Sequence, residues 1–100
     1  MFIAIVDLHT TAADRPVALD RLDAESPRVR AMPGNIAYRV YASRADDTAI
    51  TIVHEWADEA SFAGYQASES FARAGGALRP MMTAAPVSRR FHAELRETVA

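Results

Sequence analysis

Residues 48–71 read TAITIVHEWADEASFAGYQASESF, and this stretch decides the fold. Its first part alternates: Ile52, His54 and Trp56 share one face and the residues between them share the other, a period of two that is typical of a β-strand. Asp58 follows at a position typical of a helix N-cap, where a carboxylate accepts a hydrogen bond from a free backbone N–H group. The stretch therefore predicts a strand that leads directly into a helix.

The helix after this strand carries Phe62 and Tyr65 on one side, at a spacing of three residues. Ser68 begins a further helical turn. We expect the glycine pair at 75–76 to end it, because glycine readily adopts the left-handed conformation found just beyond helix ends. Residues 78–86 are then expected to form a loop or a loose turn.

The first thirty residues predict a strand and then a helix. Residues 2–10 are rich in β-branched and other apolar side chains, which favours a strand. Asp14 is expected to cap the helix that follows, and Pro16 is tolerated in its first turn. Pro27 would delete a hydrogen bond within this helix, so we expect a kink or a split there, with Ser26 capping the second piece.

Three further strands complete the predicted order. Residues 36–43 and 48–56 alternate on either side of a short polar connection and should form a hairpin. Residues 87–95 alternate as well and form the last strand. The order strand, helix, strand, strand, helix, strand over residues 1–100 predicts a single α+β domain with a ferredoxin-like βαββαβ arrangement and a four-stranded antiparallel sheet.

In this arrangement the helices cover one face of the sheet and leave the other bare. The bare face would carry residues such as Val53 or Phe91, depending on the register of the strands. An apolar sheet face is unfavourable in water, so the packing of a second sheet against it, from another copy of the chain, is physically favoured.

Composition narrows the classes of function. Apolar residues make up 50% and charged residues 24% of the chain, which is ordinary for a folded globular domain. The formal net charge is -2 without runs of like charge, so neither nucleic acid nor an anionic membrane is an expected partner. Cysteine and lysine are absent, which excludes disulfides, thiolate chemistry and Schiff bases on a side chain. The apolar runs are too short to span a membrane, and we expect a cytoplasmic protein.

Two stretches carry a resemblance to a known family. Met32-Pro33-Gly34 precedes a strand that begins Ile36-Ala-Tyr38, and residues 52–71 contain a Glu-Trp pair, an acidic helix cap and a helix ending in Ala-Ser-x-x-Phe. In this order and spacing, over nearly the whole chain, the sequence resembles the antibiotic biosynthesis monooxygenase family.

The resemblance implies a dimeric α+β barrel, in which two sheets pack face to face and each subunit keeps one pocket between sheet and helices. It also implies an activity. Some members oxidise phenolic, anthrone or hydroquinone polyketides with molecular oxygen and use neither flavin nor metal. In that chemistry the ionised substrate itself reduces oxygen, while the protein desolvates and orients it, takes up a proton and stabilises an oxyanion.

The chain departs from the family at several site positions. Many members have His where Tyr65 and Ser70 stand, so the roles of those histidines do not carry over. Haem-degrading relatives need an Asn on the first strand, a Trp near the position of Tyr65 and a His about ten residues further on. This chain has none of the three at those places, so haem degradation is not expected. Polyketide oxygenases have an Asn near Ile52 and a Tyr in place of Phe62, and of their site only Trp56 is present.

Two residues are expected to be catalytic. His54 should face the pocket, and with an unperturbed pKa near about 6.5 it can act as the base or as a hydrogen-bond partner for a phenol. A histidine satisfied by a neighbouring group is the alternative. Tyr65 can offer its hydroxyl to an oxyanion, or simply fill space.

The expected substrate-binding residues are Trp56, Phe62, Tyr38, Arg79 and Met82. Trp56 could hold a substrate oxygen with its N–H group or serve as a core anchor. Arg79 could close over an anionic substrate or be an ordinary surface arginine, and Met82 suits a pocket lid or a core gap. No histidine and carboxylate spacing matches a metal site, so neither a metal nor another cofactor is expected.

Three functions remain open from the sequence. The first is a cofactor-independent monooxygenase acting on an aromatic polyketide, anthrone or hydroquinone, with molecular oxygen as the second substrate. The second is a polyketide cyclase or isomerase on the same scaffold, in which His54 abstracts a proton and oxygen is not consumed. The third is a homodimer that binds a small molecule without catalysis.

Overall fold

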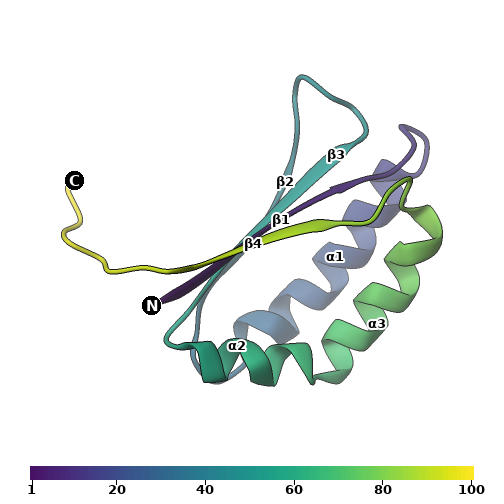
Figure 1. Ribbon diagram of the computed structural model, residues 1–100. Helices are drawn as coiled ribbons and strands as arrows, with labels where there is room; N and C mark the ends of the chain where they lie inside the picture. Colours follow the sequence, from purple (N-terminus) through teal and green to yellow (C-terminus); the bar gives the residue numbers. More distant parts are fainter.

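A four-stranded antiparallel sheet with helices on one face organises the chain (Figure 1). The computed structural model describes residues 1–100. The elements are β1 (Phe2–His9), α1 (Arg15–Arg30), β2 (Asn35–Ala42), β3 (Ala49–Trp56), α2 (Glu59–Gln66), α3 (Glu69–Leu78), the 3₁₀ turn η1 (Arg79–Met81) and β4 (Val87–His92). The strand order is β2-β3-β1-β4, and the predicted ferredoxin-like arrangement is confirmed.

The register of the strands builds one row of side chains beneath the helices. Ala4 in the middle of β1 lies opposite His54 of β3 on one side and opposite Arg90 of β4 on the other. Tyr38 of β2 in turn pairs with His54. Residues directly opposite each other in antiparallel strands point to the same face. Tyr38, His54, Ala4 and Arg90 therefore cross the sheet in one line, on the face that the helices cover.

The core lies between this face and the helices. The alternation predicted for 50–56 is confirmed, because every second residue of β3 from Ile50 to Trp56 is buried. The helices contribute the other half of the core. The buried apolar residues of the cluster are Phe2, Ala4, Leu8, Ala18, Leu22, Val29, Tyr38, Ile50, Ile52, Trp56, Phe62, Tyr65 and Leu78.

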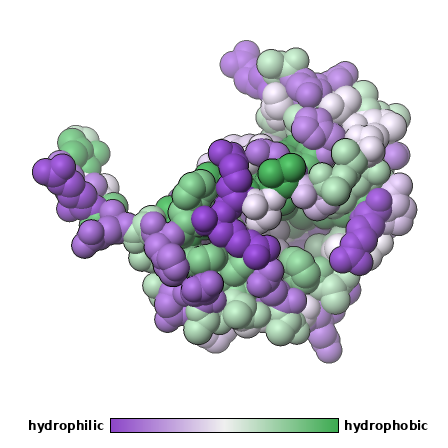
Figure 2. All heavy atoms as spheres, in the orientation of Figure 1, coloured by the Kyte–Doolittle hydropathy of each residue, from purple (hydrophilic) through white to green (hydrophobic).

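The opposite face of the sheet carries no helix (Figure 1). The register places Ile5 and Val53 side by side on it, and Phe91 beside Ile3. Both residues predicted for the bare face therefore lie there, and Phe91 remains 44% exposed. The C-terminal residues beyond β4 run away from the domain as an extended tail (Figures 1 and 2).

The first helix is continuous, so of the kink or split expected at Pro27 the split is wrong. α1 runs through Pro27 to Arg30. Ser26 does not cap a second piece. Its hydroxyl donates to the carbonyl oxygen of Leu22 over 2.8 Å, one turn back. Pro27 lies on the exposed side in the last turn, where water can replace the single backbone bond that a proline removes.

The start of α1 also differs from the expectation. Asp14 is the N-cap residue, but its side chain makes no capping hydrogen bond. Instead the hydroxyl of Thr11 accepts a hydrogen bond from the Asp14 backbone N–H group, and the Thr11 carbonyl accepts one from Arg15. The backbone of Asp14 is already helical, and this conformation differs from the extended one in which a side chain usually caps.

The second helical segment extends further than predicted. Asp58 caps α2 as expected, and Ser68, where a further turn was expected to begin, caps α3. Their side chains accept hydrogen bonds from the backbone N–H groups of Ser61 and Phe71. The glycine pair at 75–76 does not end α3, because neither glycine adopts a positive φ, and the helix continues to the buried Leu78. β4 ends at His92, three residues earlier than predicted. No helix of the protein is both long and apolar enough to cross a membrane.

Candidate functional site

A cavity of about 160 Å³ lies between the sheet, α1 and α3. Ten of its fourteen lining residues are hydrophobic, so its wall favours an apolar ligand. A cavity of about 150 Å³ can hold one benzene molecule, so this space suits a single aromatic ring. The lining residues are Val6, Leu8, Leu22, Tyr38, Ile52, His54, Tyr65, Phe71, Ala74, Gly75, Leu78, Arg79, Met82 and Pro86.

A second hollow of about 270 Å³ adjoins the first. It shares His54, Tyr65 and three further residues with the first cavity, and it adds Phe62 and Arg90 on the side of β4. The two spaces therefore meet at His54 and Tyr65, which are the residues that the sequence singles out for catalysis.

His54 is fixed by a hydrogen bond from its neighbour on the same strand face. The Trp56 indole Nε1–H group donates to the His54 Nδ1 atom over 2.8 Å, in a buried setting. An indole nitrogen can only donate, so the His54 Nδ1 atom must accept and the neutral ring carries its proton on Nε2. Burial and, secondly, the charge of Arg90 lower the pKa of His54 to about 4, so the ring is neutral at pH 7.

The other nitrogen of His54 is open to the cavity. Its imidazole makes one hydrogen bond within the protein, the one at Nδ1, and no buried side-chain nitrogen or oxygen lacks a partner. The Nε2 atom must therefore retain some accessible surface. Because His54 is only 2% exposed and lines the cavity, we infer that this surface faces the cavity. Of the two roles expected for His54, this geometry favours the hydrogen-bond donor over the base.

Two tyrosines flank His54. The Tyr65 ring lies edge-on to the His54 ring at 5.4 Å between centroids, and it stacks on Trp56 at 5.3 Å. Burial raises the pKa of both Tyr65 and Tyr38, and the neighbouring Tyr65 hydroxyl raises that of Tyr38 further. Both hydroxyls therefore stay protonated at neutral pH and can donate a hydrogen bond to an anion.

Of Trp56 and Phe62, only Phe62 lines a hollow. Trp56 is fully buried and lines neither hollow, and its N–H group is taken by His54. It therefore supports His54 and Tyr65 from behind, which is the role of a core anchor. Phe62 lines the second hollow and contacts the His54 ring at 5.6 Å between centroids.

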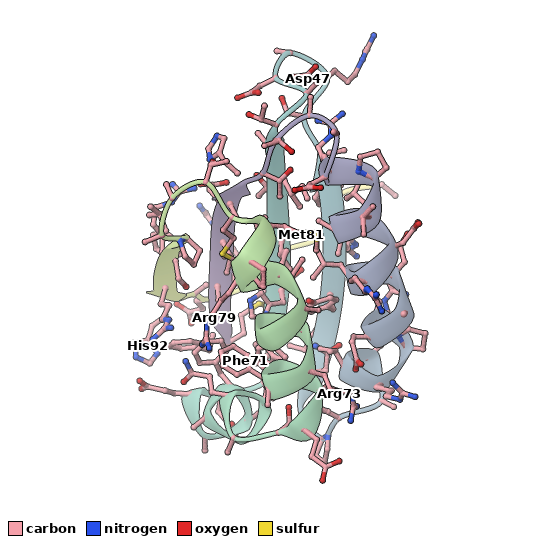
Figure 3. All side chains as sticks on the ribbon, turned by 90° about the vertical axis from the view of Figure 1, so that its right-hand side faces the viewer. Asp47, Phe71, Arg73, Arg79, Met81 and His92 are labelled. Atoms are coloured by element: carbon pink, nitrogen blue, oxygen red, sulfur yellow. The ribbon has the colours of Figure 1, made fainter.

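Arg79 and Met82 lie where α3 gives way to the following turn, and both line the first cavity. The Arg79 guanidinium folds back along the helix, so that a Cβ atom at Gly75 would lie 3.8 Å from one of its nitrogens. Arg79 and Phe71 project to the same side of α3 (Figure 3). Nowhere in the protein do three His, Asp or Glu side chains gather as a metal-binding group.

Two residues that line the hollows were not predicted from the sequence as site residues. Phe71 lines both hollows from α3, and Arg90 reaches the second from β4. The alternation of 87–95 separates Arg90 from Arg89, but it does not say which of them faces the helices. That choice depends on the pairing of β4 with β1, which places Arg90 in the row of His54.

Comparison with known proteins agrees with this architecture. The family model described as antibiotic biosynthesis monooxygenase matches residues 1–76. No curated protein matches the chain in sequence.

Several solved structures share the fold at low sequence identity. A candidate antibiotic biosynthesis monooxygenase from Deinococcus radiodurans superposes with a TM-score of 0.90 at 17% identity, covering 100% of this chain and 99% of the other. One from Nitrosomonas europaea gives 0.89 at 12% identity, covering 93% and 98%. One from Caulobacter crescentus gives 0.88 at 19% identity, covering 93% and 89%. At these identities the likeness establishes the fold.

Proposed function

Because the chain belongs to the antibiotic biosynthesis monooxygenase family, we propose that it is a cofactor-independent monooxygenase that oxidises a hydroquinone or related phenol with molecular oxygen. The observation that carries the proposal is the neutral His54 imidazole, held by Trp56, with its free N–H group on the wall of an apolar cavity. The first cavity has room for one aromatic ring beside His54, and a larger substrate would extend into the adjoining hollow of about 270 Å³.

The proposed chemistry needs an ionised substrate. A phenolate in the cavity would accept hydrogen bonds from the His54 Nε2–H group and the Tyr65 hydroxyl, which lowers the pKa of the substrate phenol. Because the Nδ1 lone pair of His54 is occupied, the substrate proton leaves to water or hydroxide rather than to His54. The electron-rich ring carbon then reduces oxygen and forms a bond to it.

The overall reaction balances without a cofactor. One oxygen atom enters the ring and the other leaves as water, so a hydroquinone and O₂ give a hydroxyquinone and H₂O. The donors that bind the phenolate can then donate to the peroxide oxygen as the O–O bond breaks. Phe62, Phe71 and Met82 keep bulk water from the reacting atoms, which strengthens each of these hydrogen bonds.

We include a homodimer in the proposal, with the helix-free face of the sheet as its interface. Ile3, Ile5, Val53 and Phe91 form an apolar patch on this face. The ion pairs Arg39–Glu55 and Arg89–Asp7 lie on the same face, and a patch of this kind rimmed by charged groups is typical of a protein–protein interface. A second copy offers the same surface, so two sheets can pack face to face. The His54 cavity opens on the other side of the sheet and would remain accessible.

Oxygen uptake with a series of hydroquinones tests the reaction. We expect oxygen to be consumed only when the protein is present, and we expect one ¹⁸O atom in the product when the reaction is run under ¹⁸O₂. His54→Phe should abolish most of the turnover, whereas His54→Gln, which keeps an N–H donor, should retain a measurable part. Equal loss in both variants would indicate that His54 acts as a base. Turnover without oxygen consumption would contradict the monooxygenase and support the cyclase or isomerase.

A further inference from the structure

The site carries positive charge that nothing in the protein neutralises. Neither hollow is lined by an Asp or Glu, although the whole chain has a formal net charge of -2. Arg79 lines the first hollow and Arg90 the second, and neither forms an ion pair. The arginines that do are Arg28, Arg39, Arg73 and Arg89.

Two adjacent residues of β4 show the contrast. Arg89 points to the helix-free face, where its guanidinium lies 3.4 Å from the carboxylate of Asp7. Arg90 points to the opposite face, where its partners are a hydroxyl and a ring. Its Nε atom donates to the Ser88 hydroxyl over 3.3 Å, and its guanidinium carbon lies 5.0 Å from the centre of the Phe62 ring.

Arg90 is exposed, and these contacts leave most of its donors free. A guanidinium has five N–H groups, and the bond to Ser88 uses only the one at Nε. In the cross-strand row, Ala4 alone separates Arg90 from His54, and both Arg90 and His54 line the second hollow. The Phe62 ring contacts both the Arg90 guanidinium and the His54 ring, so it lies between the two.

We propose that the ligand of this site is an aromatic carboxylate, with its ring beside His54 and its carboxylate bound by Arg90. A planar carboxylate matches the two parallel N–H groups of a guanidinium. Arg79, on the rim formed by α3, adds positive charge without a direct bond to the ligand. The inference rests on the proposed function for its site, and it narrows the substrate to a hydroquinone or phenol that carries an acidic group.

Benzoate and benzamide test the charge requirement, because they have nearly the same shape and neither is oxidised in the proposed reaction. Calorimetric titration at pH 7.5 should show benzoate binding at least about tenfold more tightly than benzamide, as expected for a charge-assisted hydrogen bond. Added salt should weaken the binding of benzoate and leave that of benzamide unchanged.

Three arginine variants locate the contact. Arg90→Gln should weaken benzoate binding about tenfold or more and leave benzamide binding unchanged, and Arg79→Gln should weaken benzoate binding about two- to threefold. Arg44→Gln, at the exposed turn between β2 and β3, is the matched control and should bind as the wild type does. Equal affinity for benzoate and benzamide, or an unchanged affinity in Arg90→Gln, would overturn the proposal.

The carboxylate site and the monooxygenase activity can be tested separately. If benzoate binds through Arg90 but 2,5-dihydroxybenzoate causes no oxygen uptake, the carboxylate site stands and the monooxygenase does not. If neutral hydroquinone is oxidised and benzamide binds as well as benzoate, the monooxygenase stands and the carboxylate site does not.

Discussion

The indole nitrogen of Trp56 lies 2.8 Å from the Nδ1 atom of His54, and this hydrogen bond sets the chemistry of the cavity. The two residues are two positions apart on β3, so the pleat of the strand places both side chains on one face. The bond fixes which nitrogen of His54 carries the proton and directs that N–H group toward the cavity. A ring held in this way acts as a donor in its resting state.

Trp56→Phe should release His54 from its single tautomer. In the wild type, ¹⁵N NMR of the imidazole should show the proton on Nε2, and in the variant a mixture of both neutral tautomers. The lost hydrogen bond and the smaller ring should cost about 1–3 kcal/mol of unfolding free energy. A wild-type spectrum with the proton on Nδ1 would contradict the assigned bond.

Acidification should destabilise the protein through His54. Its pKa is about 4 in the folded protein and near about 6.5 in the unfolded chain. Between these values the unfolded state binds a proton that the folded state does not, so the unfolding free energy falls as pH falls through this window. Between pH 7.5 and pH 5 the loss should be about 2 kcal/mol, measured by urea unfolding.

His54→Gln is the control for this dependence. The variant keeps His9 and His92, which form surface contacts with Asp46 and Glu59, so their contribution is common to both proteins. The pH-dependent loss should be smaller in the variant by nearly the whole contribution of His54. An unchanged pH profile would show that His54 titrates normally in the folded protein.

A buried carboxylate should make one surface arginine more important than another. Glu25 of α1 accepts hydrogen bonds from the Nε and a terminal nitrogen of Arg73 on α3, at 2.8 and 3.4 Å. Arg28 contacts the same carboxylate from one turn further along α1, at 3.2 Å. Arg73→Gln should therefore lower the urea midpoint clearly more than Arg28→Gln, because only Arg73 joins two helices.

The same carboxylate gives this difference a pH signature. The hydrogen bonds from Arg73 and, secondly, Ser70 lower the pKa of Glu25 to about 2. Its stabilising effect is therefore present above a pH of about 4.5 and is lost as pH falls toward 2. The gap between the two variants should close over that range, and a gap that persists at pH 2 would point to packing instead of charge.

Two glycines should respond to alanine in opposite ways. Gly34, between α1 and β2, has a φ of 81°, and an added Cβ atom would collide with the Ser61 side chain. Gly34→Ala should therefore cost about 1–3 kcal/mol. Gly76 lies inside α3 with open space around it, so Gly76→Ala should be neutral or stabilise by up to about 1 kcal/mol. Thermal unfolding of both variants measures the difference.

A charge on the helix-free face should separate the proposed dimer. Val53 lies in the centre of that face, opposite Ile5 of β1 and Arg39 of β2. Val53→Arg should convert dimer to monomer in sedimentation velocity, since the new cation would have to be buried beside the like charge of Arg39 at a large desolvation cost. Asp47→Ala, at the tip of the β2–β3 turn, is the control. A wild-type protein that sediments as a monomer would contradict the dimer directly.

Local pattern determined the elements and the faces of the central strands. The period of two in 48–56 was enough to predict that His54 and Trp56 share one face, because side chains alternate in any strand whatever its partners are. Asp58 and Ser68 marked the starts of α2 and α3, since a cap is made within one turn of chain. The resemblance to a family, carried by the same stretch, was confirmed by the match over residues 1–76.

Only the tertiary structure decided what surrounds those residues. The chemistry of Arg90 depends on the pairing of β4 with β1, and a shift of one residue would bring Arg89 to the cavity instead. α1 continues past Pro27 where an isolated helix would be weakened, because buried neighbours such as Val29 hold its last turn. Periodicity and caps act over a few residues, whereas the register of distant strands and the volume of the cavity arise from contacts between segments far apart in the chain.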